Sequence, residues 1–66
     1  MIRVLIVEDD VLIAEAHRTY LGRLQGFSPA AVVHTARDAM RTAAGAAAAG
    51  EPIDLVLLDL GLPDAS

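Results

Sequence analysis

The sequence predicts an α/β fold, the first half of a doubly wound parallel sheet. Two short apolar runs, residues 3–7 and 55–58, each end on an acidic residue and are typical of strands in a parallel sheet. Two segments with helical spacing lie between them, and each is followed by a glycine. The predicted order is therefore β-α-β-α-β, with crossovers long enough to join parallel strands.

The first and third predicted strands share one pattern. Residues 3–7 are followed by Glu8, Asp9 and Asp10, and residues 55–58 are followed by Asp59. The run at residues 55–58 is too short for a typical helix and is flanked by proline and glycine. We therefore interpret it as a strand buried on both faces.

The first predicted helix covers residues 11–24. Asp9 and Asp10 stand before it, where an N-cap is wanted, and Gly26 and Pro29 follow it as stop signals. Its expected apolar face consists of Ile13, Ala16, His17, Tyr20, Leu21 and Leu24.

A second strand and a second helix fill the middle of the chain. Residues 30–34 form a short β-leaning run after Pro29, which we interpret as an edge strand. Thr35 and Asp38 resemble a capping box, and the alanine-rich residues 36–49 then predict a helix.

Length and composition restrict the possible functions. A chain of 66 residues is at most one small domain, and parallel strands need more cover than such a chain can supply. We therefore expect residues 1–66 to be part of a larger domain. By itself this segment should be marginally stable or should self-associate, because one edge of its third strand is exposed. The net charge is −4, which argues against nucleic-acid binding by this segment. The absence of cysteine and of long apolar runs predicts a cytoplasmic protein with no membrane contact.

Acidic residues at the ends of two parallel strands predict a metal site. If these strands are neighbours, Glu8, Asp9 and Asp59 converge in one small cleft, where mutual repulsion favours a divalent cation. Mg²⁺ prefers oxygen ligands, and Asp9, Asp59 and a backbone carbonyl after Asp59 would suffice, with Glu8 acting through water. Asp59 could then accept a phosphoryl group as a nucleophile. The simpler alternative is that these acids only cap the first helix and solvate the strand ends.

Residues 4–10 and 54–64 together closely resemble the receiver domain of two-component response regulators. The resemblance implies a flavodoxin-like fold with strand order 2-1-3. It also implies that residues 1–66 are a partial receiver domain, which is truncated after the third strand. It also implies that Asp59 accepts phosphate from a sensor histidine kinase, with Mg²⁺ bound by Asp9, Asp59 and the Gly61 carbonyl and with Glu8 in the outer shell. The strand-four Ser or Thr and the strand-five Lys of the family are not in this chain.

Residues 14–21 and the Gly26-Phe27 turn are similar to the citrate- and dicarboxylate-responsive regulators within that family. These are transcription factors with a C-terminal helix-turn-helix domain. The resemblance implies that the full protein controls transcription, pairs as a homodimer when phosphorylated, and binds DNA only through a domain that is not in this chain.

Other interpretations remain open at this point. A phosphatase-type hydrolase would need a second aspartate two residues after its nucleophile, where Gly61 stands, so we expect a non-enzyme. A receiver that is never phosphorylated and only binds partners is a third possibility. The histidines, His17 and His34, are interpreted as structural residues.

Overall fold

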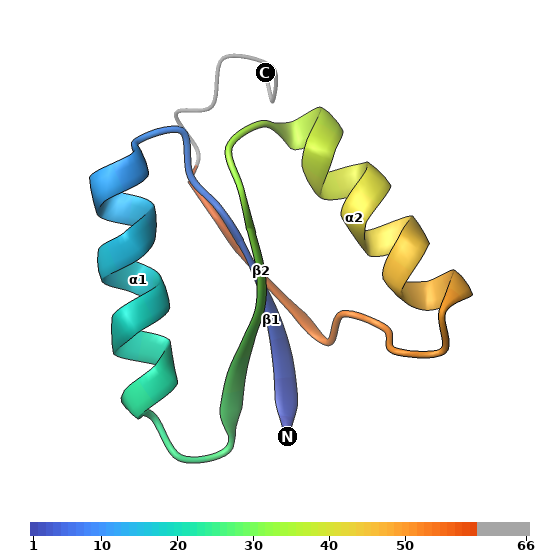
Figure 1. The fold of residues 1–66 in the computed structure, drawn as a ribbon, viewed down its shortest axis with the longest axis horizontal. Coiled ribbons are helices and arrows are strands. Elements are labelled where there is room, and N and C mark those ends of the chain that lie inside the picture. Colours follow the sequence, from blue (N-terminus) through green and yellow to red (C-terminus); the bar gives the residue numbers. More distant parts are fainter. Residues whose placement is uncertain (60–66) are drawn as a thin grey trace.

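The structure is a computed structural model, and it describes residues 1–59. Its elements are strand β1 (Ile2–Val7), helix α1 (Val11–Arg23), strand β2 (Phe27–Val33), helix α2 (Ala36–Ala48) and strand β3 (Leu55–Leu58). The three strands are parallel and lie in the order β2-β1-β3, which confirms the predicted topology. The two helices lie on either side of the sheet (Figure 1). Among residues 1–59, no helix has the length and apolar character needed to cross a membrane.

The central strand β1 forms the core. Its last four residues, 4–7, are at most 1% exposed, because β1 is paired on both edges and covered on both faces. Val4 and Ile6 pack with Leu21 of α1, whereas Leu5 and Val7 point to the other face and pack against alanines of α2. The continuous apolar run of β1 is thus explained by a strand with two covered faces.

Strand β3 differs from the prediction. Its four side chains are between 40% and 47% exposed, so the expectation that β3 is buried on both faces is wrong for this chain. The reason is geometric, because α1 and α2 contact β1 and β2 but neither packs over β3. Within residues 1–59, the outer edge of β3 pairs with no other strand, in keeping with the expected exposed edge.

Strand β2 begins earlier than the predicted residues 30–34 and includes Pro29. The register explains how the sheet accepts a proline, which has no N–H to donate. Val4 lies beside Pro29 but Leu5 lies beside Ala31, so one residue of β2 is skipped at this point. Such a bulge on an edge strand is a usual place for proline.

Helix α1 has the predicted cap, and its predicted buried face is confirmed only in part. The Asp10 carboxylate accepts hydrogen bonds from the backbone N–H groups of Leu12 and Ile13, at 2.9 and 3.0 Å. The buried residues of α1 are Ala14 and Leu21, whereas Ile13 is 46% exposed. Leu21 is buried and Leu24 packs against the core as predicted, whereas Ile13 and Tyr20 are exposed and the small Ala14 is buried in their place.

Helix α2 starts as predicted. The Thr35 hydroxyl accepts a hydrogen bond from the backbone N–H of Asp38 at 3.1 Å, which is one half of a capping box. The helix stops at Ala48, and Gly50 follows with a φ of 78°, a backbone conformation that glycine adopts without steric cost. After this turn the chain runs back from the end of α2 to β3 (Figure 1).

Candidate functional site

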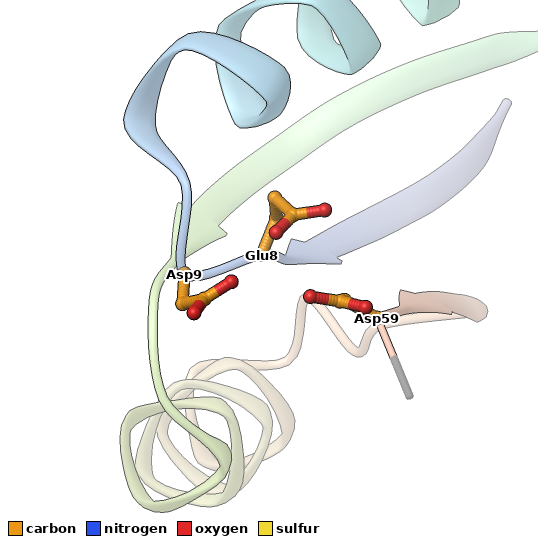
Figure 2. Close-up of side chains that lie close together, drawn as sticks. All are labelled: Glu8, Asp9 and Asp59. Carbon is orange, nitrogen blue, oxygen red and sulfur yellow. The ribbon is translucent and has the colours of Figure 1, made fainter. Parts of the chain in front are cut away.

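Three carboxylates meet at the edge of the sheet where β1 and β3 end. Val7 lies beside Leu58 in the sheet register, and the backbone N–H of Asp59 donates to the Val7 carbonyl at 3.0 Å. The next residues of both strands therefore emerge side by side. One carboxylate oxygen each from Glu8, Asp9 and Asp59 lies within 4.8 Å of the other two, and Figure 2 shows the Asp59 carboxylate directed toward the other two. The structure thus brings together the three acids that the sequence singled out.

The three acids differ in exposure. Glu8 is buried, with 7% of its surface exposed, whereas Asp59 is half-buried and Asp9 is exposed. The sequence predicted a cleft here, but no pocket forms in the described part of the chain. Within residues 1–59, the exposed part of the cluster is therefore formed by the carboxylates of Asp9 and Asp59.

The backbone of Glu8 is held by strand β2. Its N–H donates to the Val33 carbonyl at 3.0 Å, which extends the β1–β2 ladder by one residue. Its carboxylate accepts a hydrogen bond from the backbone N–H of Asp10 at 3.2 Å. Glu8 is therefore fixed at both its main chain and its side chain.

Two other acidic residues, Asp10 and Asp54, have roles outside this cluster. Asp10 caps α1 and is not among the three clustered carboxylates, as its interpretation as a capping charge predicted. Asp54 lies at the opposite end of β3, where its carboxylate accepts a hydrogen bond from the Arg3 backbone N–H at 2.8 Å. Gly61, whose carbonyl was predicted to complete the metal site, lies outside the described residues.

The electrostatics of the cluster are seen at Glu8. The hydrogen bond from the Asp10 N–H lowers the pKa of Glu8, but burial and the neighbouring carboxylates of Asp9 and Asp59 raise it, and the net pKa is above its usual value. The ionised cluster is thus unfavourable without a compensating positive charge. Oxygen ligands from closely spaced carboxylates fit Mg²⁺, so the residues present match the ion that the sequence predicted.

Replacing Glu8 by Gln is expected to stabilise the metal-free protein at neutral pH. The pKa of Glu8 is higher in the folded protein than in the unfolded chain, so the folded protein binds the proton of the Glu8 carboxyl group more tightly. The stability that this protonated carboxyl group contributes is lost as the pH rises through the folded-state pKa. The advantage of the Glu8→Gln variant over the wild type should therefore be larger at pH 7 than near the unfolded pKa of 4.5. Urea unfolding of both proteins at the two pH values, with EDTA present, measures this difference. A difference that does not change with pH would contradict it.

One residue near the site was not singled out for a site role from the sequence. His34 follows β2 directly, and its Nδ1 lies 2.8 Å from the backbone carbonyl oxygen of Glu8. The sequence contains a signal for this position, because a residue just after a parallel strand lies at the same edge as Glu8 and Asp59. What the sequence could not supply was the direction of the imidazole ring.

Comparisons with known proteins identify relatives of the chain. It is 38% identical over 60 residues to the transcriptional regulatory protein DcuR of Shigella flexneri, which covers 91% of this chain and 24% of that protein. It is also 38% identical over 64 residues to the transcriptional regulatory protein MalR of Bacillus subtilis (strain 168), which covers 96% of this chain and 25% of the relative. The chain thus spans about a quarter of the length of the curated relatives it matches. No family model and no solved structure matches the chain. The two relatives confirm the resemblance to response regulators.

Proposed function

We propose that this chain, a relative of the response regulators DcuR and MalR, is a receiver module that accepts a phosphoryl group on Asp59. One observation carries the proposal: the carboxylates of Glu8, Asp9 and Asp59 lie within 4.8 Å of one another at the ends of two adjacent parallel strands. Helix capping does not account for this cluster, because the cap of α1 is Asp10.

Asp59 has the properties required of the acceptor. A carboxylate oxygen attacks the phosphorus of a phosphohistidine, the bond from that phosphorus to the histidine nitrogen breaks, and the donor histidine retains the electron pair and takes up a proton. The Asp59 backbone is anchored to β1 through the Val7 carbonyl, so the nucleophile is carried by a rigid strand end. Its side chain is half-buried, so part of it remains accessible to a histidine on a second protein.

Asp9, Asp59 and the Gly61 carbonyl would hold Mg²⁺, with Glu8 in the outer shell. The bound ion would supply positive charge that offsets the carboxylates and the phosphoryl oxygens. Glu8 is suited to an outer position, because its carboxylate already accepts the Asp10 N–H and its side chain is buried. Asp9 is exposed, so its carboxylate is accessible to an ion from solvent.

The full protein would use this module to control transcription. Its relatives are named as transcriptional regulators, and they are about four times as long as the matched segment. We infer a sensor histidine kinase as phosphate donor, homodimer formation after phosphorylation, and DNA binding through a part of the protein that is not in this chain. Phosphorylation of a carboxylate replaces its single negative charge by a phosphoryl group that carries about two, enough to change how neighbouring surfaces associate.

A phosphorylation assay with and without Mg²⁺ tests this function. The full protein is incubated with its kinase or with acetyl phosphate and is separated on a Phos-tag gel. We expect a shifted band in Mg²⁺ and loss of most of that band in EDTA, because without the cation the carboxylate cluster repels the incoming phosphoryl group. Equal labelling in EDTA, or no labelling under either condition, would contradict the proposal.

A further inference from the structure

We propose that His34 is a positioning residue for the metal site: its imidazole holds the peptide unit that joins Glu8 to Asp9. The inference rests on the proposed function, because it concerns the same acidic cluster. It goes beyond that function by assigning a role to a side chain that is neither phosphoacceptor nor metal ligand. The residue follows β2, on the far side of β1 from Asp59.

The contact defines which nitrogen carries a proton. Nδ1 of His34 lies 2.8 Å from the carbonyl oxygen of Glu8, and a carbonyl oxygen can only accept a hydrogen bond. Nδ1 must therefore be the donor. Both the neutral Nδ1–H tautomer and the charged ring make this bond, so the role does not depend on titration of His34.

The carbonyl that His34 holds belongs to a peptide unit between two of the clustered acids. This unit is planar and rigid, so fixing its oxygen also restricts the direction in which the chain enters Asp9. The Glu8 N–H is already bound by the Val33 carbonyl at 3.0 Å. Residues 33 and 34 thus hold both backbone polar groups of Glu8, one through a strand bond and the other through a side chain.

This arrangement explains how an exposed turn can be ordered. Asp9 is exposed and follows the end of β1, so the packing that fixes residues 4–7 does not extend to it. Hydrogen bonds from outside the ligand set orient metal ligands in many proteins, and loss of such a partner typically weakens metal binding about 10- to 100-fold. His34 acts through the backbone and not on a ligand oxygen, so we expect an effect near the lower limit, about tenfold.

Three substitutions at one position separate the hydrogen bond from the bulk of the ring. The amide nitrogen of Asn occupies a place similar to that of Nδ1, whereas that of Gln extends toward the place of Nε2. We expect His34→Ala and His34→Gln to bind Mg²⁺ about tenfold more weakly than the wild type. His34→Asn should remain within about threefold of the wild type, because its amide can donate the same hydrogen bond with less favourable geometry. His17→Ala, in the middle of α1, is the matched control and should bind as the wild type does.

The measurement is an Mg²⁺ titration of the full protein followed by NMR, with thermal unfolding in EDTA to verify that each variant is folded. A long-range ¹H–¹⁵N spectrum of the metal-free wild type supplies a second readout, and we expect the proton of the neutral His34 ring on Nδ1. The inference is overturned if wild type binds Mg²⁺ and His34→Ala matches it, if all three variants lose the same affinity, or if Nδ1 carries no proton. A wild type that binds no Mg²⁺ overturns the proposed function as well.

Discussion

Asp59→Asn is expected to abolish phosphorylation of the full protein. The substitution keeps the size of the side chain and the backbone bond of residue 59 to Val7, but it replaces the nucleophilic carboxylate by a neutral amide. The cluster then retains the carboxylates of Glu8 and Asp9, neither of which lies at the end of β3. The expected result on a Phos-tag gel is loss of the shifted band at all times of incubation with Mg²⁺ and a phosphate donor.

The matched control for this prediction lies at the other end of the same strand. Asp54 precedes β3, and its carboxylate accepts a hydrogen bond from the Arg3 N–H at 2.8 Å, which an asparagine oxygen can also accept. Asp54→Asn should therefore be labelled as the wild type is. Labelling that persists in Asp59→Asn would show that another residue accepts the phosphate, and loss of labelling in Asp54→Asn would show that the assay reports folding.

Ile6→Ala is expected to cause the largest loss of stability of any single substitution considered. Ile6 is 0% exposed and packs with Val4 and Leu21 at the centre of the sheet. Truncating a fully buried isoleucine costs about 2–5 kcal/mol in lost transfer energy and cavity formation. A domain of this size is stable by roughly 3–10 kcal/mol, so the loss is a large share of the total.

Urea unfolding followed by circular dichroism measures this effect, with Leu12→Ala as the control. Leu12 is 83% exposed on α1, so its truncation should change the free energy of unfolding by less than about 0.5 kcal/mol. If Ile6→Ala were as stable as the control, β1 would not be the core that the fold requires. The same result would remove the physical reason for the fixed positions of Glu8 and Asp59.

The order of elements and the acidic cluster could be predicted from the sequence because both depend on local patterns. Strand β1 is apolar at every buried position, and Asp10 and Thr35 cap their helices as their residue types favour. Parallel strands end at the same edge of a sheet, so the acids after β1 and β3 had to be close once these strands were neighbours.

The differences arise where tertiary packing decides. The apolar run of β3 is the signature of a strand covered on both faces, but pattern alone does not show whether helices lie over it. In α1, helical spacing correctly placed Leu21 on the buried face, but packing buried Ala14 where the spacing also allowed Ile13. The bulge that admits Pro29 depends on its register with β1, which no local signal specifies.

The most direct test of the account is an Mg²⁺ titration of the wild type and of Asp9→Asn, followed by backbone amide NMR. If the three carboxylates form one cation site, Mg²⁺ will cause saturable shifts centred on residues 8, 9 and 59, and the affinity will fall at least tenfold in Asp9→Asn. Wild-type shifts that are absent, or that do not saturate and are spread over all acidic residues, would contradict a shared site.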